Sequence, residues 1–180
     1  MEKWTLQHRE VMFSNEYVEL VKDNVVTSKG VVIPDYYSIN TRHAVIVVAL
    51  DKCLNVVLKR EYRHPLNSIL IELPAGTIEE DETDGLVVAK RELREETGYV
   101  SNDWTYLGTY IESPSKTNTE ISLYLAKDSI NASDQSLDES EDIEVLVIPF
   151  SDAVEMCMNN TIRVNSSING IFRVARLLNL

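Results

Sequence analysis

The sequence has little that would suit a secreted, membrane-spanning or nucleic-acid-binding protein. It holds only two cysteines, Cys53 and Cys157, so we expect no disulfide framework and a reducing, cytoplasmic location. No apolar run is as long as a membrane span, and the first residues lack a signal-peptide pattern. Lysine and arginine total 17 against 29 acidic residues, for a formal net charge of -12. Because such a chain repels nucleic acid, we expect neither nucleic acid nor membrane as a partner.

The remaining composition is typical of a globular protein. At 180 residues and 44% hydrophobic content, the chain can form one domain with its own core and a small additional lobe. The negative charge also repels phosphate groups. A phosphate-processing enzyme of this composition therefore needs cations bound at its site.

The pattern of apolar residues predicts two regions. Residues 1–42 alternate as short strands that are too small to fold alone, so we expect this β lobe to pack on a neighbour or on a partner subunit. Residues 43–180 combine strands with a central helix, a helix capped by Ser151, and a terminal helix over 166–178. Strands on both sides of a helix indicate an α/β fold with a mixed sheet between helices.

The central helix carries three carboxylates on one face. The apolar run Leu86–Ala89 begins it and Gly98 ends it. Glu92, Glu95 and Glu96 stand at i, i+3 and i+4, within one turn of each other. Taken alone, this pattern fits a solvated acidic face as well as a site for a hard divalent cation such as Mg²⁺.

The surrounding residues resemble the signature of the Nudix hydrolase family. Arg91–Tyr99 matches its second half position by position, and Gly76 and Glu82 match its first half. Eight residues, Thr83–Lys90, separate the two halves where the family has seven. The extra residue falls in the loop at 83–85, which leaves the role of Glu82 open but keeps the downstream spacing intact.

The resemblance implies a fold and a metal site. The fold would be an α/β/α sandwich with a mixed sheet. Glu92 and Glu96 would hold Mg²⁺, or Mn²⁺ in its place, with a contribution from Glu95 and the carbonyl of Ala75. Arg91, four residues before Glu95, would orient that glutamate rather than touch substrate.

A second segment is similar to the ADP-ribose pyrophosphatase branch of the family. Arg60–Pro65 followed by Glu72–Gly76 matches the branch's Gln-aromatic-Arg and Glu-Leu-Pro-Ala-Gly motifs, with Glu61 in place of glutamine. The branch's arginine contacts the diphosphate, which implies that role for Arg63. Without the motif, Arg63 would be interpreted as a surface arginine at a strand end.

Further substrate contacts are implied outside the signature. The loop with Ser113-Pro114 that ends at Glu120 resembles the branch's Ser-Pro-Gly loop, although Ser115 replaces the glycine. Tyr17 and Tyr36 match aromatics that sandwich the nucleobase, one from each subunit of a homodimer. Their alternative interpretation is ordinary strand aromatics.

The acidic stretch 137–145 resembles the branch's mobile catalytic loop. Aligning Ile143 and Val145 with the strand that follows places the catalytic glutamate at Glu139, with Glu141 as the alternative. This glutamate would act as general base or orient the attacking water. Composition alone would make the segment a solvated acidic loop.

We therefore expect a Mg²⁺-dependent hydrolase of a nucleoside diphosphate sugar, with ADP-ribose cleaved to AMP and ribose 5-phosphate. The same chemistry on a GDP-sugar or another ADP-sugar is the nearest alternative. A nucleotide-sugar sensor that does not cleave is a weaker one, because such domains usually lose signature glutamates and this chain keeps them.

Overall fold

The computed structural model describes residues 1–180, which divide into two compact units. The first comprises Met1–His43 together with Ile111–Glu120, and the second comprises Ala44–Tyr110 together with Ile121–Leu180. The sequence places a boundary after residue 42. The structure in addition groups the polar loop 111–120 with the N-terminal lobe.

The N-terminal lobe is an antiparallel sheet in the order β1-β2-β3. Its strands are β1 (Thr5–Ser14), β2 (Val18–Val26) and β3 (Val32–Thr41). The loop 111–120 is tied to β3, where Ile39 N–H donates to the Lys116 carbonyl at 2.8 Å. Every residue of β1 is exposed, so this strand contributes almost nothing to a core.

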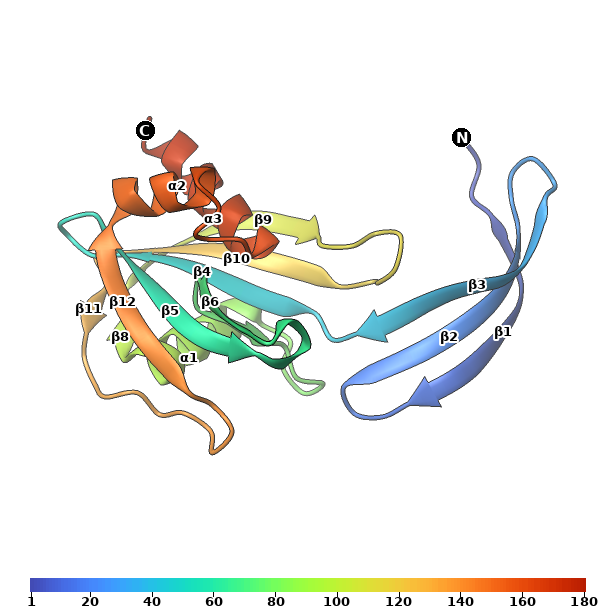
Figure 1. Ribbon diagram of the computed structural model, residues 1–180, viewed down its shortest axis with the longest axis horizontal. Coiled ribbons are helices and arrows are strands. Elements are labelled where there is room, and N and C mark those ends of the chain that lie inside the picture. Colours follow the sequence, from blue (N-terminus) through green and yellow to red (C-terminus); the bar gives the residue numbers. More distant parts are fainter. The chain divides into compact units, whose positions relative to one another are not determined.

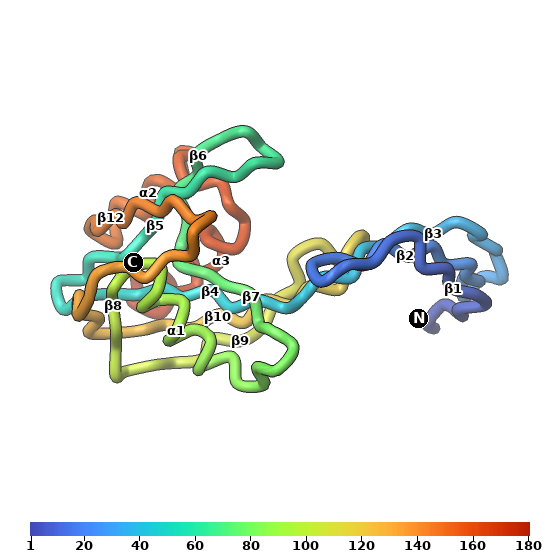
Figure 2. Tube along the Cα trace, turned by 90° about the horizontal axis from the view of Figure 1, so that it is seen from below, coloured from blue at the N-terminus to red at the C-terminus, as the bar shows by residue number.

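The second unit is built on a mixed sheet of seven strands in the order β12-β5-β4-β10-β9, with β6 paired to β5 and β7 to β4. Strands β4 and β10 are parallel, whereas β12, β5 and β6 lie side by side as antiparallel neighbours (Figure 1, Figure 2). The bounds are β4 (Ala44–Leu50), β5 (Asn55–Arg63), β6 (Ser68–Glu72), β7 (Ala75–Thr77), β9 (Asp103–Ile111), β10 (Glu120–Lys127) and β12 (Ile143–Pro149). A separate pair joins β8 (Tyr99–Val100) to β11 (Ile130–Asn131), and a 3-10 turn, η1, covers His64–Leu66.

Helices cover both faces of this sheet. Strand β4 alternates, so that Val45 and Val47 pack under α1 (Gly85–Thr97) while Ile46 and Val48 pack in the core of the opposite face. That opposite face is covered by α2 (Phe150–Met158) and α3 (Asn165–Leu177) (Figure 1). The α/β/α arrangement with a mixed sheet, expected from the sequence, is confirmed. None of the helices is both long and apolar enough to cross a membrane.

Helix α1 has defined caps at both ends. The Asp84 side chain accepts a hydrogen bond from Leu86 N–H at 2.9 Å, which satisfies a donor of the first turn. At the other end Gly98 adopts a left-handed φ of 74° and donates its N–H to the Arg94 carbonyl. The helix therefore starts and ends where the sequence predicts, within one residue.

The prediction that Ser151 caps α2 is wrong. The helix begins at Phe150, its N-cap is Pro149, and no side chain caps it. The Phe150 N–H instead donates to the Leu54 carbonyl at 2.9 Å, and the Phe150 ring is buried. Burial of this ring and the partner from another loop start the helix two residues earlier than a Ser151 cap would.

Substitution of Gly98 should have a large effect on the stability of the fold. A Cβ at this position would lie 2.1 Å from the Ser133 carbonyl oxygen, and φ is positive. We expect Gly98→Ala to destabilise the fold by about 3 kcal/mol, lowering Tm by about 10 °C. Gly30→Ala is the matched control, because φ is 79° but nothing lies within 4 Å. It should cost about 1 kcal/mol. Equal thermal shifts for the two variants would contradict the role of Ser133.

Candidate functional site

Two glutamates of α1 meet the short strand β7. Glu96 is only 3% exposed, and its Oε2 accepts a hydrogen bond from Ala75 N–H at 3.0 Å. Glu92 lies against Gly76, where a Cβ would stand 1.9 Å from the Glu92 Cδ. Gly76 is therefore required because the Glu92 carboxyl occupies the space that any side chain would fill.

The environment of Glu92 disfavours its charged form. Burial raises the pKa of Glu92 to about 7, an effect that the nearby Arg91 guanidinium opposes and the Glu96 carboxylate reinforces. A bound cation would stabilise the ionised carboxyl in the same way that Arg91 does. The site thus contains negative charge that protein groups only partly compensate.

Arg91 of α1 contacts the carboxylates of three glutamates. Its Nη1 lies 2.8 Å from Glu92 Oε1 and donates to Glu95 Oε2 at 3.1 Å. Its Nε donates to Glu82 Oε1 at 3.2 Å. Glu82 therefore holds Arg91 despite the extra residue in the loop before the helix.

A buried lysine that the sequence analysis did not single out lies beside Glu96. Lys59 of β5 is 1% exposed, and its ammonium pairs with Glu61 at 2.9 Å and with Glu96 at short range. Burial acts to lower the pKa of Lys59, but Glu96 and Glu61 outweigh this effect and the pKa is raised. The lysine is therefore charged, and removing one partner of such a pair typically costs about 3–5 kcal/mol. The signal in the sequence is a charged residue directly after the apolar run 56–58.

Arg63, at the end of β5, is part of the same network. Its Nε and Nη2 donate to the two oxygens of Glu72 at 2.9 and 2.8 Å, and its Nη1 donates to Glu61 at 2.8 Å. A guanidinium has five N–H donors, so about two remain for a ligand. The Arg63 side chain is 38% exposed, so it is accessible from solvent. This is a fixed arginine rather than a free surface one.

The carboxylates are chemically suited to bind a divalent cation. They are hard oxygen donors that gather between α1 and β7, and Gly76 leaves room for the Glu92 carboxyl. No three acidic, histidine or cysteine side chains form a ready-made metal-binding group. Lys59 pairs with Glu96, and Arg91 pairs with Glu95. A metal would have to compete with these two protein cations.

A cavity opens beside Arg63. Its volume is about 510 Å³, within the range of small-molecule sites. Arg63 and Glu72 line it together with Arg163, from the connection between α2 and α3, and with apolar walls at Leu66 and Leu70. Neither Glu72 nor Arg163 was assigned a role from the sequence, since their proximity to Arg63 depends on how β6 and the α2–α3 connection fold back.

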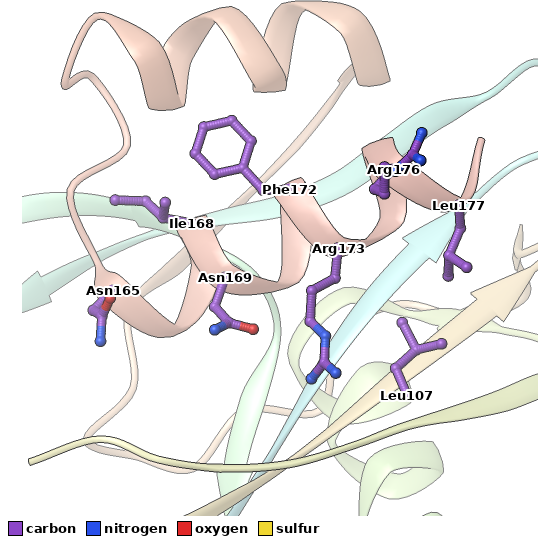
Figure 3. A pocket seen from close by; sticks show the side chains of 8 residues that line it. All are labelled: Leu107, Asn165, Ile168, Asn169, Phe172, Arg173, Arg176 and Leu177. Carbon is purple, nitrogen blue, oxygen red and sulfur yellow. The ribbon is translucent and has the colours of Figure 1, made fainter. Parts of the chain in front are cut away.

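A second pocket lies on the opposite face of the sheet, away from the carboxylates. It measures about 600 Å³, between α3 and β9. Arg173 points from α3 toward Leu107 of β9, next to Asn169 (Figure 3). No signature residue lines this pocket, so we do not include it in the candidate site.

The remaining predicted glutamates lie in the acidic loop before β12 and at the end of the loop 111–120. Glu139 is in a turn before β12, exposed, with no hydrogen bond or ion pair. The alternative, Glu141, accepts a hydrogen bond from Asp138 N–H at 3.0 Å and so closes that turn. Glu120 is exposed at the start of β10, and its N–H donates to His43 Nδ1 at 3.1 Å. Of the two loop glutamates, only Glu139 has an unengaged carboxylate.

The two tyrosines assigned to the nucleobase are far from each other within one chain. Tyr36 pairs with Asp23 in the β2–β3 ladder, whereas Tyr17 precedes Val18, which pairs with Thr41 at the other end. At about 3.4 Å per residue, the two tyrosines are about 20 Å apart. The Tyr36 ring contacts Trp4 edge to face at 6.0 Å. One chain alone therefore cannot place a base between Tyr17 and Tyr36.

Comparisons with known proteins found a matching family and several relatives. The NUDIX domain matches residues 40–164. The chain is 34% identical over 154 residues to a methanol dehydrogenase activator of Bacillus methanolicus, covering 81% of this chain and 78% of the relative. It is 28% identical over 149 residues to an ADP-ribose pyrophosphatase of Bacillus subtilis, covering 82% and 80%. It is 34% identical over 133 residues to a GDP-mannose pyrophosphatase of Escherichia coli, covering 69% of each.

A solved structure has the same fold. The crystal structure of an ADP compounds hydrolase superposes with a TM-score of 0.87, covering 99% of this chain and 96% of that one. The sequence identity is 24%, so this likeness concerns the fold alone. Because the coverage is nearly complete, the fold shared with that hydrolase includes the N-terminal lobe.

Proposed function

This chain belongs to the NUDIX domain family, and from that premise we propose that it hydrolyses the diphosphate bond of a nucleoside diphosphate sugar. The substrate we propose is ADP-ribose, cleaved to AMP and ribose 5-phosphate. The observation that supports it most is the placement of Glu92 and Glu96 against Ala75 and Gly76. A chain of charged contacts connects Glu96 to Arg63.

We propose that the bound metal ion is Mg²⁺ and that Mn²⁺ can replace it. Family membership implies a divalent metal, and the donors present are Glu92, Glu96 and the carbonyl of Ala75, with a contribution from Glu95. When bound, the ion neutralises diphosphate charge and activates the attacking water. Arg91 keeps Glu95 oriented through their contact at 3.1 Å.

The remaining steps are carried by protein groups. Arg63 uses its unengaged N–H donors on the diphosphate, while Glu72 and Glu61 hold its guanidinium plane in place. Water attacks one phosphorus, and Glu139 accepts its proton or orients it. The free carboxylate of Glu139 in an exposed turn suits a group that closes onto bound substrate.

We also propose that two copies of the chain associate through the N-terminal lobe. The exposed strand β1 carries large apolar side chains, among them Leu6, Val11 and Phe13. A second copy would also supply the other tyrosine of the Tyr17–Tyr36 pair, with Glu120 of the adjacent loop as a further substrate contact. Sedimentation velocity tests this association, and a monomer at micromolar concentration would exclude it.

The two free cysteines suit a reducing cytoplasm.

A substrate panel tests the reaction. Phosphate release after phosphatase coupling is measured for nucleoside diphosphate sugars, dinucleotides and triphosphates, with and without Mg²⁺. We expect selective, Mg²⁺-dependent cleavage of ADP-ribose. Preference for a GDP-sugar, as the name of the Escherichia coli relative suggests, would keep the chemistry and overturn the substrate. Tight binding without cleavage of any compound would instead indicate a sensor.

A further inference from the structure

Lys59 is the only lysine in the buried interior of the chain. It is 1% exposed, although a lysine is almost never fully buried unless it is paired. Along β5, Lys59, Glu61 and Arg63 point to the same face of the sheet, the face covered by α1. A lysine at this position therefore points into the space between the sheet and the glutamates of α1.

The partners of Lys59 are both part of the candidate site. Glu96 contacts Lys59 with Oε1 and accepts a hydrogen bond from Ala75 N–H with Oε2. Glu61 contacts Lys59 with one oxygen and Arg63 with the other. The result is a row of alternating charges from Arg63 through Glu61 and Lys59 to Glu96. An ordinary core position would carry an apolar side chain and require none of these contacts.

We propose that Lys59 is a built-in cation of the carboxylate site, which takes the place of one divalent ion beside Glu96 and holds that carboxylate against β7. The inference rests on the proposed function, because that function assigns Glu92 and Glu96 to the metal. Since Lys59 supplies positive charge permanently, the site binds fewer divalent ions than its carboxylates alone would. Lys59 is a positioning residue, since it acts through Glu96.

The experiment removes the positive charge of Lys59 and counts the metal ions bound per chain. Lys59→Met keeps a long, unbranched side chain but removes the ammonium. Mn²⁺ bound per chain is measured from the electron paramagnetic resonance signal of free Mn²⁺, without substrate. We expect Lys59→Met to bind one more Mn²⁺ per chain than the wild type. Lys52→Met, which removes the same charge from an exposed turn, should leave the number unchanged.

Thermal denaturation provides a second readout. In EDTA we expect Lys59→Met to melt below the wild type, and added Mn²⁺ should raise its Tm more than it raises that of the wild type. Lys59→Arg, which keeps the charge, should bind as many ions as the wild type. If Lys59→Met does not fold, the double variant Lys59→Met/Glu61→Gln removes the pair together and is measured in the same way.

The outcomes separate this inference from the proposed function. An unchanged number of bound Mn²⁺ ions in Lys59→Met, with a lower Tm only, would make Lys59 a purely structural residue and overturn the inference. A wild-type chain that binds no Mn²⁺ and cleaves no substrate would instead contradict the proposed function. A wild type that binds metal and cleaves, alongside a Lys59→Met variant with an extra ion, supports both.

Discussion

Replacing Glu96 with glutamine should reduce kcat by about 10³-fold or more while the chain stays folded. The loss of one anionic ligand removes several kcal/mol of charge stabilisation at the reacting diphosphate, and about 4 kcal/mol corresponds to 10³-fold. The glutamine oxygen can still accept the hydrogen bond from Ala75 N–H, so the contact between α1 and β7 persists. Lys59 keeps Glu61 as a partner, which limits the loss of stability.

The measurement is steady-state hydrolysis of the preferred substrate with saturating Mg²⁺, together with circular dichroism and thermal denaturation. We expect a native spectrum and a lower Tm, because the buried ammonium of Lys59 loses one of its two carboxylates. Glu155→Gln makes the same chemical change on the exposed side of α2 and should behave as wild type. Near-wild-type turnover by Glu96→Gln would mean that the metal assignment is wrong.

Gly76→Ala should separate activity from stability. The added Cβ would stand 1.9 Å from Glu92 Cδ and 2.0 Å from Glu92 Oε1, so the carboxyl has to leave its position. The displaced atoms are the flexible end of a side chain, and the fold therefore tolerates the change. A ligand displaced by about 1 Å or more typically costs about 10²-fold in rate.

Calorimetry with Mn²⁺ and hydrolysis assays check this prediction. We expect weaker metal binding and a kcat/KM lower by about 10²-fold, with Tm nearly unchanged. Thr77→Ala, at the exposed end of β7, is the control that alters the strand without entering the space of Glu92. If Gly76→Ala binds Mn²⁺ and turns over like the wild type, the position of Glu92 does not matter to the reaction.

Local sequence patterns predicted the helix and its carboxylates well, for a physical reason. Capping and helix propensity depend on neighbouring residues, so Gly98 and the run before it define α1 without reference to the rest of the chain. The prediction of Ser151 as a cap is wrong because the start of α2 is decided by the buried Phe150 ring and the distant Leu54 carbonyl. Rules for helix ends fail where a tertiary partner takes the capping role.

The sequence by itself determined which residue types are present and their order: three glutamates within one turn of a helix, Gly76 before it, and Arg63 at a strand end. These follow from periodicities of the backbone. Only the tertiary structure decided that Glu96 turns inward while Glu95 stays 31% exposed, since the rotation of α1 about its axis is set by packing on β4 and β7. It also decided that Lys59 meets Glu96 across 37 positions of sequence, a contact that no local pattern specifies.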